Sequence, residues 1–313
     1  MKSKTIFLTE DIDISEKPYV PSRFYKEVFL HIFKNYHANN NPSFKTPLIL
    51  AISGAPGMGK TFQTEIVLDD LGVKKFVISG TEFENEHAGV PEKNIRNIYK
   101  SISDDIYFRK IKYAAIVIDD IDAALGQWGG LVQYTMNRQL LLKTLIDFAD
   151  NPYRIYTYDD FDRAQECQTS RIPIIVTLND ETKMYEPLMR NGRTTIFPWI
   201  PNEDEIAKTL DGIFSNIFSD KTSFYSLYKD LLTYAQNNIN HEISSLPISL
   251  FADICSSLND EWIWEQLLKQ ESFEEISTSL RRMCDEEQYY SYTQLLELGK
   301  HLLHGCNNYL LSE

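Results

Sequence analysis

Apolar residues recur in two distinct patterns along the chain. From Pro21 to Tyr36 they return at helical spacing, which predicts an amphipathic helix. After a turn-rich break at 37–47, short apolar runs are separated by segments of helical period. Such runs are typical of buried parallel strands joined by helical crossovers, as in a doubly wound α/β domain. We expect five strands, at 47–53, 74–79, 113–119, 171–177 and 193–199.

The pattern changes after Pro201, where an acidic first turn opens a series of helical periods without a further strand-like run. Two more helical patterns follow, around Phe273–Met283 and Tyr292–Leu303, and the second has an apolar stripe of core-packing type. The polar and aromatic segment 151–170 is interpreted as a long inserted loop. The expected organisation is a flexible N-terminus at 1–20, an α/β domain at 21–201, a smaller all-helical domain at 202–270 and a helical extension at 271–313.

The segment from Gly54 to Thr61 matches G-x-x-x-x-G-K-[ST] and lies between the first expected strand and a helix. Its glycines let backbone amides face phosphate oxygens, and Lys60 brings a positive charge to the β- and γ-phosphates. The following helix adds the positive end of its dipole. We therefore predict that ATP binds here with Mg²⁺. The expected nucleotide-binding residues are Gly54, Gly57, Met58, Gly59, Lys60, Thr61 and Phe62.

Two carboxylates, Asp119 and Asp120, end the apolar strand at 113–119. We expect Asp119 to hold Mg²⁺ together with the hydroxyl of Thr61, and Asp120 to orient or deprotonate the attacking water. An acidic strand end is by itself usually a turn. The phosphate loop earlier in the chain favours the catalytic interpretation.

Three further polar residues are candidates for catalysis. Asn179 follows the strand at 171–177, where its amide can reach the γ-phosphate or the water, although it is equally a turn former or helix cap. Arg190 and Arg193 precede the last strand. They are compatible with a surface salt bridge, or with arginine fingers that reach the ATP of a neighbouring subunit. The second role requires a ring or helical oligomer.

Charge and cysteine content narrow the function classes. The net charge is −14, from 31 Lys+Arg against 45 Asp+Glu, which argues against an unaided binder of nucleic acid or anionic membranes. The four cysteines have no metal-site spacing and suggest a reducing compartment. The N-terminus lacks the apolar region of a signal peptide, and no apolar run approaches the roughly 20 residues of a membrane span. We expect a soluble cytoplasmic protein.

From about Tyr19 to Phe214 the chain resembles Rubisco activase, a family of AAA+ remodelling ATPases. The resemblance implies a AAA+ nucleotide-binding domain at 21–201 and a helical lid domain at 202–270. Beyond the nucleotide motifs, the likeness lies in PSRFYKEVFLHIFKN, ISGTEFENEHAGVPEKNIRNIYK, GGLVQYTMNRQLLLKTLIDFADNP and RIPIIVTLNDETKMYEPLMRNGRTTIFPW.

The resemblance also implies a homo-oligomer, a hexamer in that family, that hydrolyses ATP to remodel Rubisco. Loops facing the central pore would be Glu82–Val90 and Gly126–Tyr134, with 151–170 as a third loop near the pore. Phe83 and Trp128 in these loops either grip a substrate chain or are buried, and the sequence leaves both readings open.

The chain departs from the family pattern in two places. Asp119-Asp120-Ile121-Asp122 is closer to general AAA+ ATPases, and Leu250–Asp260 contains none of the arginines that the family has in its lid. The missing arginines favour a second hypothesis, a nucleotide-gated oligomeric interaction module with weak or no ATPase activity and a partner other than Rubisco. A nucleic-acid-directed AAA+ protein ranks last because the sequence is acidic.

Overall fold

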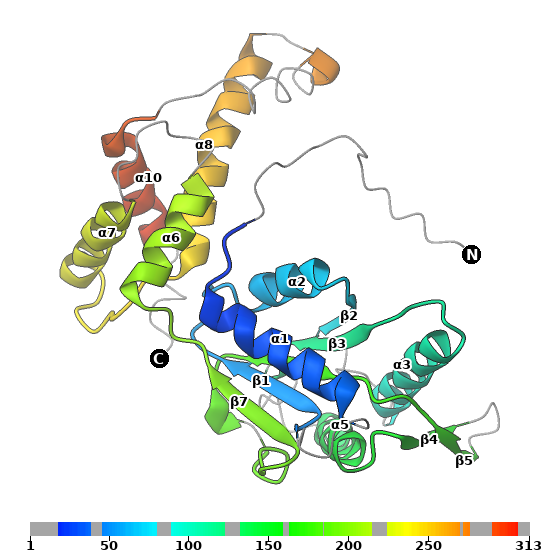
Figure 1. The fold of residues 1–313 in the computed structure, drawn as a ribbon. Coiled ribbons are helices and arrows are strands. Elements are labelled where there is room, and N and C mark those ends of the chain that lie inside the picture. Colours follow the sequence, from blue (N-terminus) through cyan, green and yellow to red (C-terminus); the bar gives the residue numbers. More distant parts are fainter. Residues whose placement is uncertain are drawn as a thin grey trace.

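A central parallel sheet organises the first part of the molecule (Figure 1). It consists of β1 (Ile49–Ser53), β2 (Lys74–Ser79), β3 (Ala114–Asp119), β6 (Ile174–Leu178) and β7 (Thr194–Pro198) in the order β2-β3-β6-β1-β7. All neighbouring strands of this sheet are parallel. The five predicted strands and the doubly wound α/β fold are thus confirmed.

The computed structural model describes most of the chain. The described residues are 18–38, 46–79, 89–122, 132–158, 163–183, 185–214, 224–269, 272–275 and 290–305. Most of the expected flexible N-terminus, of the loops at Glu82–Val90 and Gly126–Tyr134, and of the helix around Phe273–Met283 lies outside them, as do Phe83 and Trp128.

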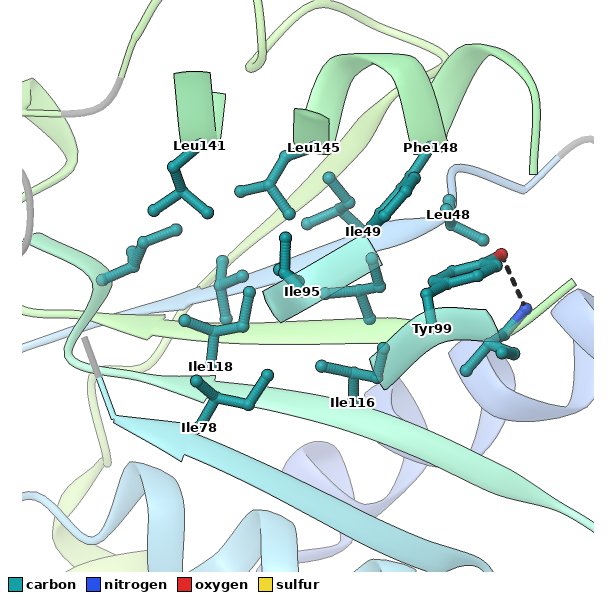
Figure 2. Close-up of a cluster of buried hydrophobic side chains, with 14 of the residues drawn as sticks. Leu48, Ile49, Ile78, Ile95, Tyr99, Ile116, Ile118, Leu141, Leu145 and Phe148 are labelled. Carbon is teal, nitrogen blue, oxygen red and sulfur yellow. Dashed lines mark hydrogen bonds between the residues drawn. The ribbon is translucent and has the colours of Figure 1, made fainter. Parts of the chain in front are cut away.

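Helices cover both faces of the sheet. On one face, Ile49 and Ala51 of β1 share a core with α3 (Val90–Tyr107) and α5 (Val132–Asp150). Figure 2 shows this core, where the ring of Tyr99 lies beside Phe148 and its hydroxyl accepts the N–H of Ile172 at 3.1 Å.

On the opposite face, Leu50 and Ile52 of β1 pack in a core with α1 (Ser22–His37) and α2 (Lys60–Asp70). Because successive side chains of a strand point to opposite faces, an uninterrupted apolar run serves both cores at once. Every residue of β1 and β6 is buried for this reason.

The expectation of a long loop at 151–170 was wrong. The segment contains an antiparallel hairpin of β4 (Arg154–Tyr158) and β5 (Ala164–Gln168). Only Ile155 and Thr157 of β4 are buried, while their neighbours are more exposed. A half-buried hairpin alternates polar with apolar residues, so its composition looked like that of a loop.

The described residues after the sheet form a bundle of helices, as the sequence pattern predicted. These are α6 (Glu203–Phe214), α7 (Tyr225–Asn238), α8 (Ile248–Leu268) and α10 (Tyr292–Gly305). α10 lies in the same core as α7 and α8, and a Cβ on Gly299 would approach Leu231 within 2.7 Å. Among the described residues no helix combines the length and apolar character that crossing a membrane requires.

Candidate nucleotide site

The predicted phosphate loop follows β1 directly and ends in the first turn of α2. Gly57 and Gly59 adopt φ angles of 72° and 73°, a left-handed conformation that side chains with a Cβ rarely tolerate. At Gly54, a Cβ would lie 2.4 Å from the carbonyl oxygen of Trp199. The glycines of the sequence motif therefore meet steric demands of this turn.

Lys60 lies inside the loop, with only 6% of its surface exposed. Its ammonium group donates to the carbonyl of Gly54 at 2.6 Å and to that of Ala55 at 3.0 Å. It also donates to the side-chain oxygen of Asn179 at 2.7 Å. Burial lowers the pKa of Lys60, and the charge of Asp120 is the largest opposing effect. The structure thus joins the loop cation to the predicted polar residue at the tip of β6.

The acidic end of β3 lies against the same loop. Asp119 accepts hydrogen bonds from the hydroxyls of both Thr61 and Thr177 on the same carboxylate oxygen. The two predicted metal ligands, Thr61 and Asp119, are therefore in direct contact. Both offer hard oxygen donors of the kind that Mg²⁺ prefers when phosphate oxygens and water complete its shell.

Asp120 has an unusual backbone and an altered acidity. Its φ angle is 48°, which is uncommon for a residue other than glycine. Burial raises the pKa of its carboxyl group, and the charges of Asp119 and Asp122 raise it further. Lys60 and the side chain of Asn179 act in the opposite direction. A carboxylate with a raised pKa next to a cation has the chemistry of a proton acceptor.

Asp122 links the ends of two strands. One of its carboxylate oxygens accepts the backbone N–H of Asn179 at 2.9 Å and that of Asp180 at 3.2 Å. The other oxygen is buried and has no hydrogen-bond partner in the described part of the chain. The sequence placed Asp122 in the run Asp119-Asp120-Ile121-Asp122, which was expected to support Mg²⁺ binding, but gave it no separate role.

The two predicted arginine fingers have different surroundings. Arg193 donates two hydrogen bonds of 2.7 Å to the carboxylate of Asp150 and a third to the carbonyl of Pro187. Arg190 is exposed, and its guanidinium makes no hydrogen bond or ion pair with any residue in the described ranges. The structure does not bring Arg193 to the loop that holds Lys60.

Other residues contact the loop without having been predicted. The indole N–H of Trp199 donates to the carbonyl of Met58 at 3.0 Å, and Trp199 is buried under the ring-stacked guanidinium of Arg23. From the helical bundle, the N–H of Ser249 donates to the carbonyl of Gly57 at 3.0 Å. Of the predicted loop residues, Met58 is buried, whereas Phe62 is 60% exposed.

One of the unpredicted residues had a signal in the sequence. Thr177 is a hydroxyl residue in the otherwise apolar run that forms β6, and it is fully buried. A polar side chain at a buried strand position needs hydrogen-bond partners, so such a residue is a candidate for a structural or functional contact. In the helical bundle, Cys255 belongs to the segment without arginines and faces α6, where its sulfur lies 3.9 Å from the carbonyl oxygen of Ile213.

Comparison with known proteins adds independent observations. Residues 50–202 match the family model described as ATPase family associated with various cellular activities (AAA). The chain is 38% identical to the chloroplastic ribulose bisphosphate carboxylase/oxygenase activase of Vigna radiata var. radiata over 202 residues, which are 64% of this chain and 44% of that protein. It is 35% identical to the activase of Anabaena sp. over 262 residues, 83% of this chain and 58% of that protein.

A third relative, the chloroplastic activase of Oryza sativa subsp. japonica, is 38% identical over 196 residues, which are 63% of this chain and 41% of that protein. The chain spans about half the length of these curated relatives.

Proposed function

Because the chain carries a AAA-family ATPase domain and is related to Rubisco activase, we propose that it hydrolyses ATP in an oligomer to remodel a protein target. One observation supports the enzymatic part most strongly. Lys60, Thr61, Asp119, Asp120 and Asn179 come from three separate segments and form one connected group at the strand ends. This arrangement has the parts that phosphoryl transfer to water requires.

In the proposed mechanism, the ammonium of Lys60 leaves its carbonyl partners and turns to the β- and γ-phosphates. Thr61 and Asp119 would hold Mg²⁺, and the bound ion would supply positive charge to the phosphate oxygens. Asp120 orients the attacking water and accepts its proton. Once Lys60 no longer donates to the side-chain oxygen of Asn179, the amide of Asn179 contacts the γ-phosphate or the water.

The first test is ATP turnover and ADP binding by the wild type and by Lys60→Ala. A matched control is Lys75→Ala, because Lys75 is a partly exposed lysine paired with Glu65 and Asp69. We expect Lys60→Ala to lose nucleotide binding and turnover, and Lys75→Ala to retain both. Failure of the wild type to bind ATP or ADP in magnesium buffer would remove the proposal.

We propose a homo-oligomer, a hexamer by analogy with the family, in which arginines reach the ATP of the neighbouring subunit. Arg190 is the more direct finger because its guanidinium has no partner among the described residues, whereas Arg193 is paired with Asp150. Arg190→Ala and Lys60→Ala should each be inactive alone. Mixing them should restore turnover, because mixed oligomers contain some sites with both an intact loop and an intact finger. Absence of any restoration would contradict the arrangement in trans.

The proposed target is Rubisco, since the relatives are named as its activases. The test is reactivation of Rubisco inhibited by a bound sugar phosphate, with Asp120→Asn as the inactive control. ATP turnover without reactivation would leave the ATPase in place and end the assignment of the target.

The alternative, a nucleotide-gated interaction module with weak or no turnover, is favoured by the segment Leu250–Asp260. It contains no arginine, and Ile254 within it is fully buried in the helical core. Nucleotide-dependent assembly with equal turnover in the wild type and Asp120→Asn would support this alternative.

A further inference from the structure

We propose that Thr177 is a positioning residue that sets the orientation of Asp119 toward Mg²⁺ and the backbone conformation of Asp120. This inference rests on the proposed Mg²⁺–ATP site and adds to it a residue that would touch neither the metal nor the nucleotide.

The hydroxyl of Thr177 is the only polar part of a fully buried side chain. It donates its single hydrogen to the carboxylate of Asp119 and accepts the N–H of Asp120 at 3.0 Å. A hydroxyl has one donor and two acceptor positions, so both contacts are made by one group in one rotamer. Replacement by valine would keep the volume and remove both contacts.

The position of Thr177 follows from the sheet. β3 and β6 are parallel neighbours, and their register pairs Ile118 with Val176. The next residues along the two strands are Asp119 and Thr177, which therefore emerge together at the carboxyl ends. The hydroxyl at this position of β6 donates to the carboxylate at the end of β3.

The contact with Asp119 has a direct consequence for metal binding. The same carboxylate oxygen also accepts the hydroxyl of Thr61. With a lone pair of Thr61 on Mg²⁺, the hydrogen bond from Thr177 would still hold the carboxylate of Asp119 in its orientation. Partners that orient a ligand in this way commonly change metal affinity by about 10- to 100-fold when they are removed.

The contact with Asp120 has a second consequence. Asp120 has a φ angle of 48°, a conformation that most residues avoid because of steric strain. The hydrogen bond from its N–H to Thr177 stabilises the chain in that conformation. One buried hydroxyl thus fixes the carboxylate proposed to hold Mg²⁺ and the backbone that aims the proposed base.

The test compares Thr177→Val and Thr177→Ala, which lack the hydroxyl, with Thr177→Ser, which retains it. ADP affinity is measured by calorimetry in EDTA and across a magnesium titration. We expect the hydroxyl-free variants to keep the wild-type affinity in EDTA and to need about 10-fold more Mg²⁺ for tight binding. Thr177→Ser should stay within about 3-fold of the wild type, since serine presents the same donor and acceptor.

Two controls separate positioning from general damage to the strand. Ile175→Val removes a buried methyl group from the same strand and should leave the magnesium dependence unchanged, since Ile175 is apolar and fully buried. In an Asp119→Asn background, Thr177→Val should add little further loss, because the group that it orients has already lost its charge. Full additivity of the two losses would contradict the proposal.

The two possible failures are distinguishable. A wild type that does not bind ADP at all would remove the proposed nucleotide site, and one that binds ADP with no dependence on Mg²⁺ would remove the Mg²⁺ ligation proposed for Thr61 and Asp119. A wild type with normal magnesium dependence that is matched by Thr177→Val or Thr177→Ala would overturn the role of Thr177 alone. The use of two hydroxyl-free variants of different volume keeps the test valid if one of them does not fold.

Discussion

The α/β part of the molecule contains two clusters of charged groups, one around Lys60 at the strand ends and one around Arg96 beside the β4–β5 hairpin. Arg96 lies on α3 with a side chain that is 5% exposed. It donates to Glu92 at 2.9 Å, to Thr144 at 3.1 Å, to Asp147 at 2.9 Å and to the carbonyl of Tyr156 at 3.5 Å. It thereby joins α3, α5 and β4.

The two clusters treat their charges in opposite ways. The Arg96 cluster surrounds one cation with acceptors from three elements. The Lys60 cluster places a buried cation beside carboxylates that are incompletely hydrogen-bonded or electrostatically perturbed. One oxygen of Asp122 has no hydrogen-bond partner among the described residues, and the pKa of Asp120 is raised. Perturbed and incompletely paired groups are typical of sites that await a ligand, whereas matched networks fix architecture. The difference predicts that substitutions in the first cluster affect stability and those in the second affect turnover.

The largest effect is expected for Asp120→Asn. Loss of the proposed base should lower ATP turnover by about 10²- to 10⁴-fold. The free energy of unfolding should not fall, because asparagine tolerates the left-handed backbone and removes a carboxylate that lies close to Asp119 and Asp122. Turnover and urea denaturation of the same preparations check both parts. A large loss of stability would show that Asp120 belongs to the architecture.

The same residue gives a pH dependence with a defined sign. The pKa of Asp120 is raised above its ordinary value, chiefly by burial, and only the ionised carboxylate accepts a proton. Wild-type turnover should therefore decline as the pH falls toward this raised pKa. The residual turnover of Asp120→Asn should lack that acid limb.

The next effect concerns Arg96. Arg96→Met should lower the free energy of unfolding by about 2–3 kcal/mol, because Glu92 and Asp147 keep their charges and lose the buried partner. Lys100→Met is a matched control on the same helix, where the pair with Asp104 is largely exposed, and it should cost less than about 0.5 kcal/mol. ADP affinity should be unchanged in both variants, and a loss of affinity in Arg96→Met alone would mean that the two clusters are coupled.

A buried histidine on the other face of the sheet offers a stability effect without a charged partner. Burial lowers the pKa of His31 to about 3, opposed by the hydrogen bond to the carbonyl of Ile174 and assisted by the charge of Arg171. Below about pH 6.5, His31 is protonated in the unfolded chain but stays neutral in the native chain. Stability should thus fall as the pH decreases from 6.5 toward 3.

His31→Gln removes this contribution. Between pH 7.5 and pH 5, wild-type stability should decline by about 2 kcal/mol more than that of His31→Gln. Denaturant unfolding at both pH values measures the difference. At pH 7.5 the histidine is neutral in both states, so the gap between the two proteins there gives the packing cost alone. Parallel pH curves would disprove the expected contribution.

Features of the fold could be predicted from the sequence where they depend on residues close together in the chain. β1 and β6 were predictable because burial on both faces produces an uninterrupted apolar run. The β4–β5 hairpin was not predictable from the sequence. Its exposed residues are polar or aromatic, and β4 has only two buried positions, which is too few to form a recognisable alternation.

The candidate site divides in the same way. Lys60 and Thr61 belong to a contiguous motif whose spacing can be recognised. The contacts of Asp122 with Asn179 and of Thr177 with Asp119 join residues more than 50 positions apart, through strand neighbours that only the sheet order brings together. The role of Arg96 could not be predicted either. A single arginine in a helical pattern is usually solvent-exposed, and only the tertiary structure shows that α5 and β4 enclose this one.

The smallest expected effect concerns Arg193, which is paired like Arg96 but is more exposed to solvent. Its pair with Asp150 is bidentate but partly exposed, at 23% and 41% of the two side chains. Arg193→Lys keeps the charge, loses the fork geometry and should lower the free energy of unfolding by less than about 1 kcal/mol. Its turnover should fall less than that of Arg190→Lys, because Arg193 is already bound within its own chain. A larger loss of turnover in Arg193→Lys would mean that Arg193 leaves Asp150 in the oligomer and acts on the neighbouring phosphates itself.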